Sequence, residues 1–360
     1  MTLIKWPGGK SREIKEFQHL IPTYDRYIEP FFGGGAVFFH ENPKQSVIND
    51  ISTNLTDFYS LVKTQNEHFK FYLLQYNDAF SYYKNHTSKN IDIFFEKYST
   101  NASFSKQEIM KLFINKEFHE IITNYEIFYD FLAQSINDKF KRTKKNELKK
   151  QMCQTDLENN LITGITSGFY LYFRKVYNDI QLAPLKHTYS KEYTIANFFW
   201  IREYCYGSMF RYNSEGAFNI PYGGISYNNK DFSRKINQIF NEKTKVLFEN
   251  TNIFNDDFET LLDQLTLSSS DFIFLDPPYD TEFSDYEGRS FKGSDQERLR
   301  DFLLTTPAKF LLVIKNTNFI YSLYNRDEFT IENFDKTYTY NIRDRNNRAV
   351  SHLIITNKKA

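Results

Sequence analysis

The chain has 360 residues, with 45 Lys and Arg against 45 Asp and Glu, so its formal net charge is zero. This length allows a large core and two structural units. The balanced charge excludes a nucleic-acid binder that acts through overall positive charge, so phosphate contacts must come from local basic patches. Cys153, Cys205 and the scattered histidines lack the spacing of a disulfide framework or a zinc site, so we expect no metal and a reducing compartment.

No apolar run approaches the length that crosses a membrane, and residues 1–6 lack the apolar stretch of a signal peptide. We therefore expect a cytoplasmic protein without a membrane partner. The chain is also rich in rings, with 37 Phe and 26 Tyr, and most of them are expected to lie in the core.

The first sixty residues predict alternating helices and strands. Helical spacing at 12–20 precedes a strand at 27–31, a glycine turn with a helix from Ala36, and a second strand at 45–49. From about 64 to 160 the pattern becomes mostly helical, because Phe, Tyr and Ile recur at three- and four-residue intervals with almost no Gly or Pro.

The alternation of strands and helices resumes after an irregular, glycine-containing section. The expected elements are helices at 232–241, 258–265 and 295–304, strands at 246–249, 271–275 and 310–314, and two final strands at 329–340 and 349–356. Strands that alternate with helices predict an open parallel α/β sheet. The last two strands lack an intervening helix and predict an antiparallel hairpin at the sheet edge. We expect a discontinuous α/β domain at 1–62 and 232–360, with an insert at 63–231.

One motif follows the apolar strand predicted at 271–275: Asp276-Pro277-Pro278-Tyr279. The carboxylate can accept an N–H group, the proline-fixed backbone can offer a carbonyl, and the tyrosine can stack on a base. These properties suit methylation of an exocyclic amine on a flipped-out nucleobase. The alternative is a proline-rich turn that caps a strand.

A second motif, Glu29-Pro30-Phe31-Phe32-Gly33-Gly34-Gly35, follows the first strand and opens a helix. Glycines at this place let the backbone approach a ligand at the carboxyl end of the sheet. Asp50 ends the next strand, where an acid often binds ribose hydroxyls. Together they indicate an adenosine-containing cofactor, whereas each alone is compatible with a tight turn.

Two further motifs are incomplete. Gly9-Lys10-Ser11 resembles the end of a phosphate-binding loop, but Ile4 stands where that loop needs glycine. The segment 164–168 carries Thr166 at the nucleophile position of a hydrolase elbow. These departures argue against an NTPase and against a serine hydrolase.

Several basic segments could contact DNA. The densest, 139–145, is equally compatible with phosphate contact and with a solvated helix face. Arg211 and Asn213 have the side chains that pair with guanine and adenine, although a hairpin with local side-chain bonds would explain them too. Arg345 and Arg348 are expected in the turn of the terminal hairpin, where they would either grip phosphates or be solvated.

Four motifs, in their order along the chain, resemble those of the Dam-type, or alpha-group, DNA adenine-N6 methyltransferases. They are Lys-Trp-Pro-Gly-Gly-Lys at 5–10, Glu-Pro-Phe-x-Gly-x-Gly at 29–35, Asn-Asp-Ile-x-x-x-Leu at 49–55 and Asp-Pro-Pro-Tyr at 276–279. The segment 210–223 is similar to a stretch of Dam enzymes that bind GATC. The matching motifs lie toward both ends of the chain and in its middle.

The resemblance implies a Rossmann-like S-adenosylmethionine-dependent sheet with a mostly helical target-recognition insert. The implied cofactor residues are Trp6, Lys10, Glu29, Phe31, Gly33, Gly35, Asp50, Asp257, Phe258 and Asp276. The implied catalytic residues are Asp276, Pro277, Pro278 and Tyr279. The composition of 280–291, rich in acids, Gly and Ser, predicts a mobile loop that closes over the base. The DNA-binding candidates are Arg174, Arg211, Tyr212, Asn213, Asn219, Tyr222, Arg345 and Arg348.

The implied activity is methyl transfer to adenine N6 in a short duplex site, with GATC as the first expectation. This activity is compatible with a restriction–modification system that has a cognate endonuclease. The sequence leaves the oligomeric state open. One alternative is cytosine-N4 methylation, but Asp276 before Pro277-Pro278 argues against it. Another alternative is a DNA-binding homologue without catalytic activity. The stretch 64–160 matches no quoted family motif, so its role and the exact target stay open.

Overall fold

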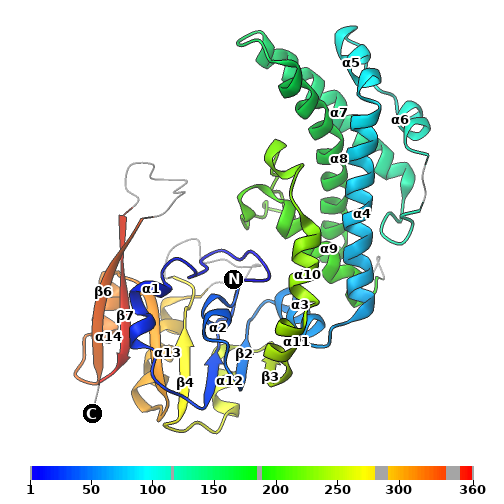
Figure 1. The fold of residues 1–360 in the computed structure, drawn as a ribbon. Helices are drawn as coiled ribbons and strands as arrows, with labels where there is room; N and C mark the ends of the chain where they lie inside the picture. The colour runs from blue at the N-terminus through cyan, green and yellow to red at the C-terminus, as the bar shows by residue number, and fades with distance from the viewer. Residues whose placement is uncertain (1, 115–116, 185–188, 280–290, 338–348, 359–360) are drawn as a thin grey trace. The chain divides into compact units, whose positions relative to one another are not determined.

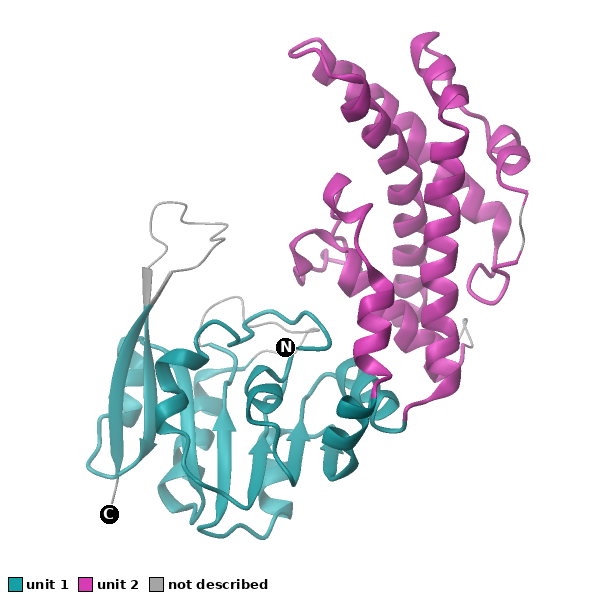
Figure 2. Cartoon of the chain, in the orientation of Figure 1, with its two compact units in different colours: residues 1–64, 242–360 teal, residues 65–241 magenta. Residues whose placement is uncertain are grey.

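The computed structural model describes residues 2–114, 117–184, 189–279, 291–337 and 349–358. The chain forms two compact units (Figure 2): unit 1 comprises Met1–Thr64 and Glu242–Ala360, and unit 2 comprises Gln65–Asn241. The sequence predicts the second boundary at residue 232, whereas the units divide after Asn241. Helix α10 (Phe232–Ile239) therefore lies in unit 2, where the ring of Phe232 packs edge-on against Trp200 at 5.0 Å.

Unit 1 is built on a seven-stranded sheet with the order β3-β2-β1-β4-β5-β7-β6 (Figure 1). Five neighbouring strands are parallel: β3 (Thr251–Phe254), β2 (Ser46–Asn49), β1 (Arg26–Glu29), β4 (Asp271–Leu275) and β5 (Lys309–Lys315). Strand β7 (Ala349–Asn357) pairs antiparallel with both β5 and β6 (Phe329–Thr337). The predicted α/β sheet and its antiparallel edge hairpin are thus confirmed.

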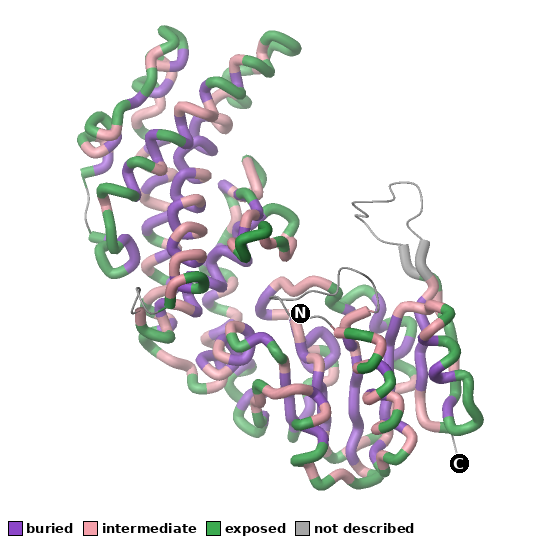
Figure 3. The backbone as a smooth tube through the Cα atoms, turned by 180° about the vertical axis from the view of Figure 1, so that it is seen from behind, coloured by how far each residue is buried: buried purple, intermediate pink, exposed green. Residues whose placement is uncertain are grey.

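Helices cover both faces of this sheet. On one face, Leu261, Leu299 and Tyr324 join a core cluster with Ile273 and Leu312, and they come from α12 (Phe258–Gln264), α13 (Gly293–Thr305) and α14 (Asn318–Tyr324). Rings dominate the opposite face, which receives α1 (Ile14–Phe17), η1 (Gln18–Leu20), α2 (Ala36–Glu41), α3 (Thr53–Lys63) and α11 (Glu242–Glu249). The strands between the two layers are largely buried (Figure 3).

The prediction of a strand at 246–249 is wrong. These residues end helix α11, and the strand β3 follows at Thr251–Phe254. Leu247 and Phe248 are buried while Val246 is 55% exposed, so the short apolar run is one face of a helix. A run of this length cannot be assigned to helix or strand by periodicity alone. Helix α14 was not predicted.

Unit 2 is helical, and its core is a cluster of aromatic rings. Its main helices are α4 (Glu67–Lys89), α5 (Ile91–Ser99), α6 (Lys106–Leu112), α7 (Tyr125–Glu147), α8 (Gln154–Leu182), α9 (Lys191–Tyr204) and α10. Trp200 of α9 packs against Tyr76 and Phe80 of α4 and Phe169 of α8, with ring centroids 5.3–5.8 Å apart. These rings join the three long helices into one core.

Two glycines of α8 let this helix approach α7 closely. A Cβ atom on Gly168 would lie 2.8 Å from the backbone oxygen of Phe131 and 2.9 Å from Cα of Leu132, so a larger side chain there would require a shift of the helices. A Cβ atom on Gly164 would meet Cδ1 of Ile136 and lie 3.1 Å from its Cα. The segment 164–168 thus serves helix packing. None of the described helices combines the length and apolar composition needed to cross a bilayer.

Candidate active site and a preformed loop

The chain changes direction within the sheet between β1 and β4. Strands β1, β2 and β3 extend one way from this point, and β4 and β5 extend the other way. Open α/β sheets bind ligands outside the carboxyl ends of the strands at such a switch point. Three carboxylates lie at these strand ends: Glu29 on β1, Asp50 after β2 and Asp276 after β4.

The 276–279 turn is joined to the N-terminal segment through Lys10. The Lys10 ammonium forms an ion pair with Oδ1 of Asp276, and it lies 3.1 Å from the carbonyl oxygen of Gly8 and 3.4 Å from the hydroxyl of Tyr279. Lys10 is only 2% exposed, so its charge is held by these partners rather than by water. The structure therefore brings two predicted site regions, 5–10 and 276–279, into contact.

Two further side chains hold the same turn, and sequence reasoning missed both. The hydroxyl of Tyr279 lies 3.1 Å from Nε2 of His352, a buried residue of β7. Gln296, which is also buried, donates from Nε2 to the carbonyl oxygen of Pro278 at 3.0 Å. Neither belongs to a recognisable motif, because only the strand order and the docking of α13 bring them to the turn.

The glycine-rich turn after β1 is braced by Asp50. Its carboxylate accepts the backbone N–H groups of Gly33 at 2.8 Å and Ser52 at 2.9 Å. Gly33 has a φ of +51°, and a Cβ atom there would lie 2.8 Å from Cδ1 of Trp6. Gly35, with a φ of +63°, is the left-handed residue that begins α2. Glycine is thus required for the backbone and for the approach of Trp6.

Glu29 lies buried between these features. Burial raises its pKa well above the ordinary value, the hydrogen bond donated by the Tyr27 hydroxyl at 2.8 Å lowers it, and the charges of Asp276 and Asp50 raise it further. Asp276 and Asp50 therefore lie close enough to Glu29 for their charges to act on its carboxyl group.

Beside this acidic group lies an aromatic patch. Phe31 packs on Phe258 with ring centroids 5.3 Å apart and edge-on against Phe291 at 5.6 Å. Asp257 accepts the N–H of Glu259 at the start of α12 and pairs with Arg298. The structure therefore brings Phe31 and Phe258 together, whereas the carboxylate of Asp257 forms an ion pair with Arg298 of α13. The rest of the expected closing loop, 280–290, lies outside the described residues.

In unit 2, the 205–224 loop is a preformed structure on α8 and α9. Isolated bridges join Cys205 to Tyr222 and Tyr212 to Phe218. Asn178 of α8 both donates to the carbonyl of Phe218 at 3.0 Å and accepts its N–H at 2.8 Å. Buried Arg202 of α9 donates to the carbonyls of Ser208 and Met209, at 2.8 and 2.7 Å. The loop backbone is therefore held from inside by helix side chains.

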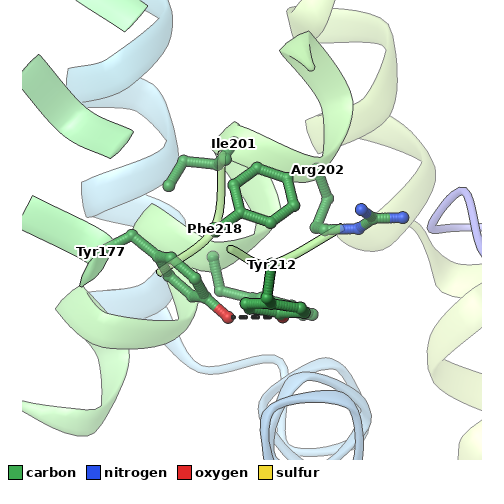
Figure 4. A pocket seen from close by; sticks show the side chains of 6 residues that line it. Tyr177, Ile201, Arg202, Tyr212 and Phe218 are labelled. Atoms are coloured by element: carbon green, nitrogen blue, oxygen red, sulfur yellow. Dashed lines mark hydrogen bonds between the residues drawn. The ribbon is translucent and has the colours of Figure 1, made fainter. Parts of the chain in front are cut away.

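The DNA-binding candidates divide into two groups in this loop. Arg174 donates to the carbonyl of Ile220 at 3.0 Å, and buried Tyr222 bonds Asn228, so both support the loop. The Tyr212 hydroxyl meets that of Tyr177 at 3.4 Å in a small pocket (Figure 4), which Phe198, Ile201, Arg202 and Phe218 also line.

Arg211 and Asn213 lie on the exposed side of the loop. Nε of Arg211 donates to Oδ1 of half-buried Asn219 at 2.9 Å. Oδ1 of Asn213 accepts the N–H groups of Glu215 and Ala217 and closes the turn. Arg345 and Arg348 lie outside the described residues.

The basic segment 139–145 lies in the last turns of α7. Lys139 is half-buried, and burial followed by the charge of Arg142 lowers its pKa. Lys144 lies over the ring of Tyr98 at 4.8 Å. The segment is therefore partly engaged in packing between helices of unit 2.

Comparison with known proteins agrees with this geometry. The family model described as D12 class N6 adenine-specific DNA methyltransferase matches residues 6–116 and 113–340. The type II methyltransferase M.CviBI of Paramecium bursaria Chlorella virus NC1A is 26% identical, over 99% of this chain and 98% of its own length.

Two other relatives bear similar names. The type II methyltransferase M1.LlaDCHI of Lactococcus lactis subsp. cremoris is 22% identical, over 98% of this chain and 94% of its own length. The DNA N-6-adenine-methyltransferase of Escherichia phage P1 is 23% identical, over 92% of this chain and 32% of its own length. Because the family model matches residues in both segments of the α/β unit and in the helical unit between them, the chain belongs to the D12 class of N6 adenine-specific DNA methyltransferases.

Proposed function

We propose that the chain transfers a methyl group from S-adenosylmethionine to N6 of an adenine flipped out of duplex DNA. Unit 1 is the catalytic unit and unit 2 the target-recognition unit in this proposal. The observation that carries it is the position of the 276–279 turn: Asp276 follows β4 at the switch point of the sheet, beside the glycine-rich turn of β1. The adenine-specific family supports the choice of base.

The residues at this edge fit the proposed cofactor. S-adenosylmethionine carries an ammonium group, ribose hydroxyls and a positively charged sulfur, all of which suit carboxylates. Asp50 and Asp276 supply carboxylates, and a bound cation would favour the ionised form of the buried Glu29, whose pKa is raised in the free protein. The ring of Phe258, packed on Phe31, offers an apolar surface for an adenine ring. We assign Asp50 to the ribose, and Trp6, Lys10, Glu29 and the turn at 33–35 to the methionine end. When bound, this cofactor supplies the electrophilic methyl group.

The chain's own contribution to the chemistry is to prepare the amine. The lone pair of adenine N6 is delocalised into the ring, which makes it a poor nucleophile. Asp276 and the carbonyl of Pro277 each accept one N–H, which draws the nitrogen toward tetrahedral geometry and leaves its lone pair available. The proton leaves after methylation, so no prior deprotonation is needed. Tyr279 stacks on the base, a contact of about 1–3 kcal/mol.

The target site is proposed from the 205–224 loop. Arg211 and Asn213 project from its exposed side, and their side chains are those that read guanine and adenine. The similarity of 210–223 to Dam enzymes that bind GATC supports GATC as the site. Two relatives are named type II methyltransferases, which supports a restriction–modification system with a cognate endonuclease.

The main test combines a methyl-transfer assay with mapping of the product. Plasmid DNA, purified protein and labelled S-adenosylmethionine should yield N6-methyladenine. Asp276→Ala should remove transfer while cofactor binding stays measurable, whereas Asp263→Ala, at an exposed acid of α12, should behave as the wild type. N4-methylcytosine as the product would establish the alternative reaction. DNA binding without any methylation at saturating cofactor would identify a non-catalytic homologue.

The recognition site needs its own experiment. Single-molecule sequencing of DNA from a host that expresses the gene reports every methylated adenine with its context. Methylation confined to GATC supports the proposed site, and a different consensus replaces it without affecting the proposed chemistry.

A further inference from the structure

The ammonium of Lys10 has three protons, and three acceptors surround it among the residues that the structure describes. They are the carbonyl oxygen of Gly8 at 3.1 Å, Oδ1 of Asp276 and the hydroxyl oxygen of Tyr279 at 3.4 Å. Because an ammonium group can only donate, the oxygen of Tyr279 accepts in its contact with Lys10. The phenolic proton of Tyr279 then points to a different partner.

His352 lies where that proton can go. Its Nε2 is 3.1 Å from the hydroxyl of Tyr279, and the two rings meet at an angle of 65° with centroids 5.6 Å apart. If Tyr279 donates to Nε2, this nitrogen carries no proton, and the imidazole is neutral with its proton on Nδ1. In this arrangement Lys10 donates to Tyr279, and Tyr279 donates to His352.

The sheet holds the imidazole in place. His352 is buried in β7, between its register partners Lys315 of β5 and Phe334 of β6. The ring of Phe334 stacks on it at 5.5 Å and 27°. A fixed acceptor of this kind restricts the rotation of the Tyr279 side chain, which stands at the end of a turn.

We propose that His352 is a positioning residue, which fixes the phenol ring of Tyr279 in the orientation that receives the flipped adenine. The proposal rests on the stacking role assigned to Tyr279 above. A ring that is already fixed loses less conformational entropy when the base arrives than a ring that rotates freely. His352 touches neither the base nor the cofactor in this proposal, and it acts through the Tyr279 hydroxyl alone.

The kinetic test compares His352→Phe, His352→Gln, Tyr279→Phe and the double variant His352→Phe/Tyr279→Phe. Loss of one hydrogen bond should lower kcat/KM about 3- to 10-fold in His352→Phe, mainly through KM for DNA. Gln places an acceptor near the position of Nε2 and should restore most of the loss. The double variant should be no worse than Tyr279→Phe, because both single changes break the same bond.

A matched control is His86→Phe. This half-buried histidine of unit 2 stacks on Tyr82 at 5.4 Å, so the variant also replaces an imidazole in an aromatic environment. Its kcat/KM should equal that of the wild type. Fluorescence of 2-aminopurine in place of the target adenine should show weaker base extrusion in His352→Phe and an unchanged signal in His86→Phe.

A second measurement needs no activity. Nitrogen-15 NMR of the free protein should show His352, identified by its loss in His352→Gln, with the proton on Nδ1, and Tyr279→Phe should shift its Nε2 resonance. In the NMR spectrum, a proton on Nε2 of His352, or an Nε2 resonance that Tyr279→Phe leaves unchanged, would overturn the proposal. In the kinetic test, so would additive losses of kcat/KM in the double variant, or wild-type kcat/KM in a stably folded His352→Phe. If the wild type methylates no DNA, the proposed function fails, and the NMR result still decides whether the bond exists.

Discussion

The 276–279 turn of unit 1 and the 205–224 loop of unit 2 are both irregular segments held by side chains from other elements, but they are held in different ways. An ammonium, an imidazole and an amide converge on the turn, and two of them contact the side chains of Asp276 and Tyr279. In the loop, Asn178, Arg174 and Arg202 bond backbone groups. In the turn, other elements thus bind the side chains of Asp276 and Tyr279 themselves. In the loop they hold the backbone, and a few side chains of the loop are exposed.

This difference predicts how the two segments respond to substitution. Substitution of Asp276 in the turn should alter the chemical step at unchanged DNA affinity. Changes to the loop's anchors should alter stability and DNA binding together, and changes on its exposed side should alter DNA binding and sequence discrimination without loss of stability.

The largest effect is expected for Asp276→Asn. The amide retains the size of the carboxylate but loses its charge, so the amine loses its charged acceptor and kcat should fall about 100- to 1000-fold. Single-turnover methylation measures this, and DNA affinity should change little. Asp263→Asn, at an exposed acid of the same unit, should have no effect. A fall in DNA affinity that matches the fall in rate would contradict the distinction between turn and loop.

Arg202→Met should have the next largest effect. The substitution removes two hydrogen bonds to loop carbonyls and the contact of the guanidinium with Phe210 at 3.5 Å, with a destabilisation of about 2–4 kcal/mol. Thermal unfolding and DNA binding should both weaken. If DNA binding stays at the wild-type level while stability falls, the loop is not the reading surface.

Arg211→Ala probes the exposed side of the loop. A base contact should cost about 1–3 kcal/mol and relax discrimination at one position of the site. A phosphate contact would instead weaken all sequences equally and lower the salt slope by about one. Binding to a set of singly substituted duplexes separates the two outcomes. Arg234→Ala, at an exposed arginine of α10, is the control that should leave binding unchanged.

Glu29→Gln should have the smallest effect on DNA recognition, and it should change stability with a sign that depends on pH. Burial, followed by the charges of Asp276 and Asp50, raises the pKa of Glu29 in the folded protein. The wild type therefore loses stability as pH rises from the ordinary glutamate pKa through the raised value, by at most about 1.4 kcal/mol per pH unit. The variant lacks this dependence, so its Tm relative to the wild type should increase from pH 5 to pH 8. A constant difference would show that Glu29 ionises normally.

Much of unit 1 could be predicted because its elements carry local signals. The strand expected at 271–275 is β4 to the residue, and the final strands without a helix between them form the edge hairpin. The error at 246–249 arose because a three-residue apolar run has no period. The spacing of rings predicted the helical stretch that holds α4 and α7, but it did not predict α8 and α9 or the contact of Gly164 and Gly168 with α7.

By itself, the sequence determined the chemistry at the strand ends, since a carboxylate, two prolines and a tyrosine keep their nature wherever the chain places them. It also determined the order of the motifs, from which the resemblance to adenine methyltransferases followed. Only the tertiary structure decided which groups meet the turn. Lys10 lies 266 residues from Asp276 along the chain, and Tyr279 lies 73 residues from His352. Contacts across such distances depend on strand order and helix docking, which no local pattern encodes.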